Sequence, residues 1–107
     1  MKQIQQGDVL FQEIKELPQD AQLMQEGGLL ILVKGEATGH HHAIKESKSK
    51  LYVQERQGFK IMFLEVAMPE VVEHQEHASQ ILDAGIWMIG QVKEKDWVSQ
   101  MERKVID

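Results

Sequence analysis

The stretch Leu29-Leu30-Ile31-Leu32-Val33 is the longest apolar run in the chain, and it lies between Gly27-Gly28 and Gly35. A short run that is apolar on both faces and bounded by glycine is typical of a β-strand buried on both sides. We therefore expect the central strand of a sheet at residues 29–33.

Shorter segments on both sides of this run show the alternation of side chains that a strand requires. Strands are expected at residues 8–15, 40–44, 51–53, 60–66, 70–73 and 86–92. The polar connection Glu55-Arg56-Gln57-Gly58 predicts that the strands at 51–53 and 60–66 form a hairpin. The charged stretch 45–50 is expected to separate 40–44 from 51–53.

Two segments have a different pattern. Residues 21–26 are expected to form about one and a half helical turns that end at Gly27-Gly28. The tail, residues 96–107, fits either a short helix or one more strand. Trp87 and Trp97 are expected to serve in packing.

Six or seven short strands with at most one or two short helices predict an all-β fold, a small barrel or a sandwich. The 107 residues have no linker, repeat or low-complexity segment. A chain of this length is expected to form a single domain over residues 1–107.

The composition excludes several function classes. The formal net charge is −5 and no basic patch interrupts the acidic background, so neither nucleic acid nor a membrane surface is an expected partner. The chain has no cysteine, which removes disulfides, thiolate metal sites and thiol nucleophiles. No apolar segment is long enough for a signal peptide or a membrane span, so cytoplasmic residence is expected. Pairing of open strand edges predicts a homodimer.

The five histidines fall into two clusters, His40-His41-His42 and His74 with His77. In an extended segment His40 and His42 point to one side, with Cα atoms roughly 6.5–7 Å apart, and His41 points to the other. Two imidazoles at that spacing can bind one metal ion. His74 and His77 share a face only if the backbone turns between them.

Glu73 and Glu76 stand beside the second cluster as carboxylate ligands or as partners that fix an imidazole tautomer. Imidazoles with a carboxylate suit zinc, iron, nickel, manganese or copper rather than calcium or magnesium. Three protein ligands would leave a position open for chemistry, whereas four would make a structural site. The alternative is that these histidines are solvated loop residues. Gly7-Asp8 is interpreted as a turn.

The segment Gly39-His40-His41-His42-Ala43-Ile44-Lys45-Glu46 resembles the first motif of the cupins. In that family a His-x-His pair, a glutamate a few residues on and a distal histidine hold a metal ion inside a β-barrel. The resemblance implies that His40, His42 and Glu46 are ligands. The glycine of the second cupin motif is absent between Pro69 and His74.

A second resemblance covers more of the chain and is to a group of small uncharacterised bacterial and phage-linked proteins. It is carried by the segments Gln6-Gly7-Asp8-Val9-Leu10, 35–42, His74-Gln75-Glu76-His77-Ala78 and Ala84-Gly85-Ile86. It groups His40, His42, His74 and His77 as one set but implies no reaction.

Two functions follow from these patterns. The first is a noncatalytic binding or structural module with a histidine-rich site for a divalent transition metal, acting on a protein or small-molecule partner. The second is a cupin-like, metal-dependent hydrolase, isomerase or oxygenase in which Glu73 or Glu76 is the general base. The absence of a recognisable nucleophile or cofactor motif favours the first.

Overall fold

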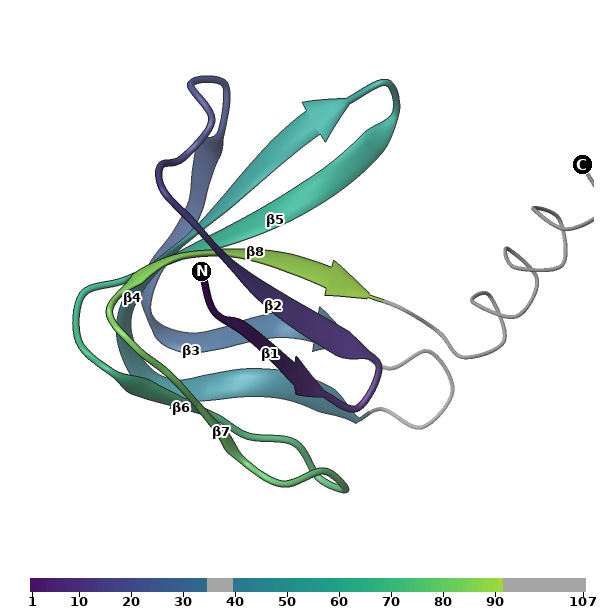
Figure 1. Ribbon diagram of the computed structural model, residues 1–107, viewed down its shortest axis with the longest axis vertical. Coiled ribbons are helices and arrows are strands. Elements are labelled where there is room, and N and C mark those ends of the chain that lie inside the picture. Colours follow the sequence, from purple (N-terminus) through teal and green to yellow (C-terminus); the bar gives the residue numbers. More distant parts are fainter. Residues whose placement is uncertain (35–39, 92–107) are drawn as a thin grey trace, which may run out of the picture.

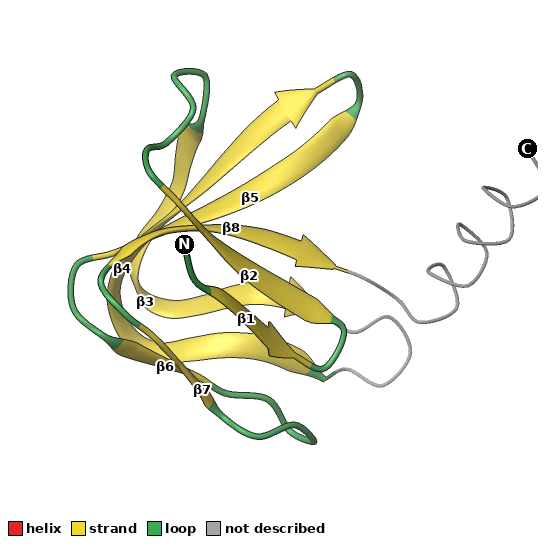
Figure 2. Cartoon of the chain, in the orientation of Figure 1, coloured by secondary structure: helices red, strands yellow, loops and turns green. Residues whose placement is uncertain are grey.

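Strands account for the regular structure of the protein in a computed structural model that describes residues 1–34 and 40–91 (Figures 1 and 2). Eight strands and no helix are found in these ranges, which confirms the all-β prediction. The strands are β1 (Gln3–Gln6), β2 (Val9–Ile14), β3 (Gln22–Lys34), β4 (His41–Arg56), β5 (Phe59–Val66), β6 (Glu70–Val72), β7 (Gln80–Leu82) and β8 (Gly85–Gln91).

Six of the strands form an antiparallel sheet in the order β1-β2-β8-β5-β4-β3. Strands β2, β8 and β5 lie between β1 and β4 in this order. Gln6 of β1 nevertheless contacts His42 of β4, which shows that the sheet curls. Strands β6 and β7 form a separate hairpin. It docks on β4 through two backbone hydrogen bonds between Ala43 and Glu73, of 3.0 and 2.8 Å.

The core fills the inside of this curl. Apolar residues at alternate positions of the strands point inward, and Trp87 is completely buried with its indole N–H donated to the carbonyl of Asp83. The core residues are Val9, Phe11, Leu30, Leu32, Ile44, Leu51, Leu64, Val66, Val72, Leu82, Trp87 and Ile89. The packing role predicted for Trp87 is thereby confirmed, whereas Trp97 lies outside the described residues.

The prediction of a central strand at residues 29–33 is wrong, because β3 is an edge strand of the sheet. Leu30 and Leu32 face the core, whereas Leu29 is 51% exposed. The run therefore has one buried face and one open face. Apolar residues on the open face disguise the alternation in the sequence.

The helix predicted at residues 21–26 is also wrong, since β3 begins at Gln22. Pairing with residues 50–53 of β4 overrides the local helical pattern. Gly27 and Gly28 have positive φ angles of 68° and 77°. They lie at register shifts within the strand rather than at a helix terminus.

The prediction that the charged stretch 45–50 separates two strands is wrong, because β4 runs through it without a break. Glu46 has a φ of 49°, which bends the strand. Just after the bend, the carboxylate of Glu70 accepts hydrogen bonds from the hydroxyls of Ser47 (2.6 Å) and Ser49 (2.5 Å) and from the N–H of Lys48 (2.7 Å). We call these four residues the Glu70 clasp; it ties β6 to β4.

The described residues contain no helix of the length and apolarity that crossing a membrane requires. The predicted tail element at residues 96–107 lies outside the described residues.

Candidate functional site

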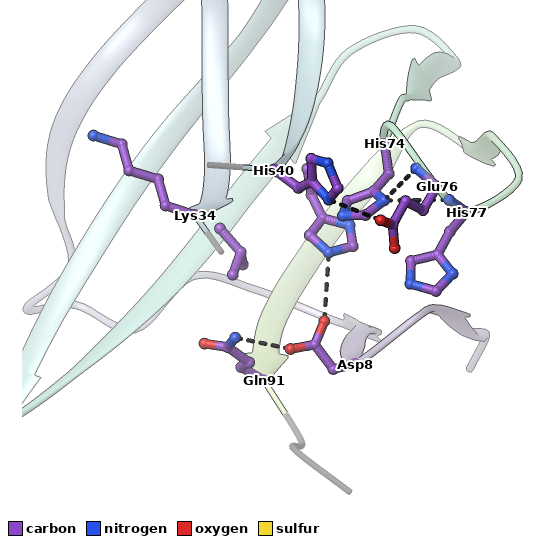
Figure 3. Close-up of a pocket in the computed structure, with 9 residues that line it drawn as sticks. Asp8, Lys34, His40, His74, Glu76, His77 and Gln91 are labelled. Atoms are coloured by element: carbon purple, nitrogen blue, oxygen red, sulfur yellow. Dashed lines mark hydrogen bonds and ion pairs between the residues drawn. The ribbon is translucent and has the colours of Figure 1, made fainter. Parts of the chain in front are cut away.

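A cleft of about 200 Å³ opens where the β1–β2 turn, the start of β4, the end of β8 and the β6–β7 loop meet (Figure 3). It is lined by Asp8, Val33, Lys34, His40, His42, His74, Glu76, His77 and Gln91. The structure thus brings together the four histidines that the sequence grouped. The side chain of Lys34 points away from the histidine rings.

His42 forms the buried side of the cleft and is 2% exposed. Its Nδ1 lies 2.7 Å from Oε1 of Gln6. The amide nitrogen of Gln6 donates to the carbonyls of Val72 and Ala78, both at 2.9 Å. An amide with both N–H groups on carbonyls has only its oxygen left, so the neutral imidazole of His42 donates from Nδ1 and keeps its lone pair at Nε2.

Asp8 faces that lone pair. Its Oδ1 lies 3.5 Å from Nε2 of His42, and its Oδ2 accepts a 2.9 Å hydrogen bond from the amide of Gln91. Asp8 follows Gly7, whose φ of 59° makes the tight turn between β1 and β2. The carboxylate is therefore aimed by its turn and held by a neighbouring strand.

The pKa values of His42 and Asp8 are both lowered, which favours the neutral form of the imidazole and the charged form of the carboxylate. Burial lowers the pKa of His42, and charge on His74 and His77 lowers it further, against the opposing effect of Asp8. Burial alone would raise the pKa of Asp8, but hydrogen bonds from Gln91 and from its own backbone, with the charge of His42, bring that pKa below its usual value. Near neutral pH the pair is therefore a neutral imidazole facing a carboxylate.

The β6–β7 loop supplies the other side of the cleft. The Nδ1 of His74 accepts hydrogen bonds from the backbone N–H groups of Glu76 (3.0 Å) and His77 (3.2 Å). This turn lets His74 and His77 share a face, as the sequence required. Because Nδ1 of His74 is an acceptor, the proton of the neutral ring is on Nε2. Burial, followed by charge on His77 and His40, lowers the pKa of His74.

The rings of three histidines form a bent stack. The ring centre of His74 lies 4.3 Å from that of His42 and 4.7 Å from that of His77, and those of His42 and His77 are 6.5 Å apart. His77 also covers Gly7, where an added Cβ would overlap the imidazole. The absence of a side chain at position 7 therefore makes room for the ring.

His40 lies at the mouth of the cleft, immediately before β4. Its Nδ1 is 3.3 Å from Oε1 of Glu76, and its ring meets that of His74 edge to face with centres 5.7 Å apart. A carboxylate beside one ring nitrogen orients the imidazole and directs its other nitrogen away.

Three further residues considered from the sequence do not line the cleft. His41 is on the other side of the strand and its backbone N–H donates to the side chain of Gln75. Glu73 pairs through its backbone with Ala43, and its carboxylate lies 3.8 Å from Lys45. Glu46 is at the bend of β4 and borders a separate hollow with Lys45. Of the three ligands that the cupin resemblance implies, His40 and His42 line the cleft and Glu46 does not.

The rings of His42, His74 and His77 lie over one another, and that of His40 meets His74 edge to face. Within residues 1–34 and 40–91, no three histidine, aspartate or glutamate side chains are arranged as the ligands of one ion. The best-aligned pair is Nε2 of His42 with Oδ1 of Asp8. Chemically, this arrangement offers the carboxylate of Asp8, the buried lone pair of His42 and the exposed imidazole of His77 to a cation in the cleft.

Sequence reasoning missed three residues of the site: Gln6, Asp8 and Gln91. Asp8 was interpreted only as part of a turn, and the turn is also what aims its carboxylate. The glutamines gave no local signal, because each acts on a residue far away in the sequence.

A family model matches residues 5–91 of the chain, and its description is Domain of unknown function (DUF8820). This range contains every residue that lines the cleft. Neither the curated proteins nor the solved structures gave a match. The expected relationship to an uncharacterised family is confirmed as far as membership of such a family. The chain belongs to the DUF8820 domain family.

Proposed function

We propose that this domain binds a divalent transition metal ion in the histidine cleft and acts as a noncatalytic binding module. The observation that carries the proposal is the pair formed by Nε2 of His42 and Oδ1 of Asp8, 3.5 Å apart. Each of the two groups is held by a glutamine amide, Gln6 for His42 and Gln91 for Asp8.

Two electron-rich atoms that face each other across a cleft repel unless a cation lies between them. A proton is a poor candidate, since burial lowers the pKa of His42. A metal ion suits the gap. Ligand atoms bound at about 2.0–2.2 Å in tetrahedral geometry lie roughly 3.3–3.6 Å from each other. The separation of 3.5 Å between His42 and Asp8 falls in that range.

We propose His77 as the third ligand. Its ring lies against Gly7, next to Asp8, and is exposed, so we expect it to turn toward the ion. His74 is less suited, because both backbone N–H groups of its turn occupy its Nδ1. Nitrogen and oxygen ligands of this kind fit zinc, iron, nickel or manganese.

A cupin-like metal-dependent enzyme is the second candidate, and one observation favours it. Glu76 lies 3.3 Å from Nδ1 of His40 at the mouth of the cleft, which is how a carboxylate prepares an imidazole for general-base catalysis. In this alternative Glu76 acts through His40. Glu73, whose carboxylate faces Lys45, has no such role.

The test is metal uptake by untagged protein freed of metal by dialysis. Titration calorimetry and elemental analysis are expected to give one zinc or nickel ion per chain. Thermal unfolding is expected to show a higher melting temperature when the metal is present. His42→Ala and Asp8→Asn are expected to abolish uptake. His41→Ala is the matched control, since it removes an adjacent histidine outside the cleft. The proposal fails if the wild-type chain takes up no ion, or if His41→Ala and His42→Ala bind equally.

The predicted homodimer is a separate proposal. The edge strand β3 exposes Leu23, Met24 and Leu29, and an unpaired apolar edge is a template for pairing with a second copy. Sedimentation velocity is expected to show a dimer that Leu23→Lys dissociates. A monomer at all concentrations would contradict it.

A further inference from the structure

We infer that Gln6 is a positioning residue that sets the tautomer of His42 and makes it depend on the docking of the β6–β7 hairpin. Gln6 is the last residue of β1 and is 1% exposed. Its side chain is the point where the curled sheet, the hairpin and His42 meet.

The hydrogen bonds of Gln6 leave one orientation for its amide. The nitrogen donates to the carbonyl of Val72, at the end of β6, and to that of Ala78, just before β7. If the amide were flipped, its oxygen would face both carbonyls and its N–H groups would face His42. Two acceptors would then be buried against a third, which is costly.

The tautomer of His42 follows from that orientation. Gln6 Oε1 accepts at 2.7 Å, so Nδ1 of His42 carries the proton and Nε2 carries the lone pair. Because the hairpin carbonyls orient the amide, the lone pair is fixed in the cleft while the hairpin is docked. If the acceptor at Gln6 is lost, the proton is expected to move to Nε2, where Oδ1 of Asp8 lies 3.5 Å away.

His74 provides an internal contrast. Its Nδ1 accepts from two backbone N–H groups, so its proton is on Nε2. Two rings whose centres are 4.3 Å apart thus have opposite tautomers, each set by a different neighbour. Of the two, His42 presents its Nε2 lone pair to Asp8. The consequence for metal affinity rests on the proposed function, whereas the tautomer itself does not.

The first experiment is nitrogen-15 NMR of the imidazoles near pH 8, in metal-free protein. Wild-type His42 is expected to show a protonated Nδ1, and His74 a protonated Nε2. A protonated Nε2 in wild-type His42 would overturn the inference, and this measurement needs no variant.

Two variants separate positioning from packing. Gln6→Met keeps the side-chain length and removes the acceptor, so the proton of His42 is expected to move to Nε2. Gln6→Glu presents an acceptor oxygen to Nδ1 in either orientation of its carboxylate. It is therefore expected to retain the tautomer, although it loses the donors to the hairpin. Gln3→Met changes an exposed glutamine of the same strand and is expected to alter nothing. The same tautomer in Gln6→Met and wild type would contradict the inference.

Zinc affinity then separates this inference from the proposed function. Gln6→Met is expected to weaken zinc binding about 10- to 100-fold, the usual effect of losing a partner that orients a ligand. If the NMR result holds and wild-type protein binds no zinc, the tautomer inference stands and the metal proposal fails. If zinc binds and wild-type His42 has a protonated Nε2, the reverse is true.

Discussion

On the sheet side of the cleft His42 is 2% exposed and Asp8 is held by Gln91, whereas on the hairpin side Glu76 and His77 are exposed. On the sheet side, a glutamine amide from another strand holds each of these two groups, Gln6 for His42 and Gln91 for Asp8. The hairpin side is instead ordered by one turn, in which His74 binds the backbone after it. The cleft therefore has buried, held side chains on one side and exposed side chains on the other.

The Glu70 clasp attaches the hairpin side to the sheet, and its removal is expected to have the largest effect. Glu70→Ala removes the acceptor of two buried hydroxyls and one backbone N–H. Because unpaired buried polar groups are costly, the free energy of unfolding is expected to fall by about 2–4 kcal/mol. Urea denaturation measures it.

The control for that change is Glu73→Ala, three residues further along the hairpin. Within residues 1–34 and 40–91, the contact recorded for its carboxylate is a solvent-exposed one of 3.8 Å with Lys45. Such pairs contribute about 0–1 kcal/mol. Equal losses for Glu70→Ala and Glu73→Ala would show that the Glu70 clasp does not hold the hairpin.

Gly7→Ala tests the contact between the two halves. The new Cβ would overlap the His77 ring and would sit at a positive φ. The expected loss of stability is about 1–3 kcal/mol. The matched control is Gly58→Ala, because Gly58 has a φ of 82° and open space around it. If both variants lose the same free energy, His77 does not pack on Gly7.

A smaller effect is expected from pH. Burial, with charge on neighbouring histidines, lowers the pKa of both His42 and His74 in the folded chain. The unfolded chain then binds more protons around the ordinary histidine pKa of about 6.5, so the free energy of unfolding rises with pH through that window. Stability is lost as the pH falls.

Melting temperatures between about pH 5 and 8 measure this slope, in the range set by the ordinary histidine pKa. The double variant His42→Gln/His74→Gln is expected to flatten it. Identical slopes in the double variant and the wild-type chain would mean that the cleft does not lower the pKa of these two rings.

Local periodicity predicted the parts of the fold that depend on neighbours in sequence. Alternation placed His40 and His42 on one side of a strand with His41 on the other, and the cleft has that arrangement. It could not show that residues 29–33 lie at the edge of the sheet, because an edge strand with apolar side chains on both faces has the same sequence pattern as a central strand. Nor could it reveal that β4 continues through residues 45–50, since the partner of Ser47 and Ser49 is Glu70 of another strand.

The supports of the site were beyond local patterns for the same reason. Gln6 acts on His42, which is 36 residues away, and on Ala78, which is 72 residues away. Gln91 acts on Asp8 across 83 residues. The contact of Gln6 with His42 exists because the sheet curls until β1 meets β4, and that of Gln91 with Asp8 exists because β8 pairs with β2. Histidine clusters mark the site in the sequence, but the residues that orient them carry no signal of their own.

The proposed metal site is best tested by a crystal structure of the protein grown with zinc, in which anomalous scattering at the zinc edge locates the ion. We expect a single strong peak between Nε2 of His42 and Oδ1 of Asp8, about 2.0–2.2 Å from each, with His77 turned toward it. An ion bound at His41 or elsewhere on the surface, or a cleft without a peak, would contradict it.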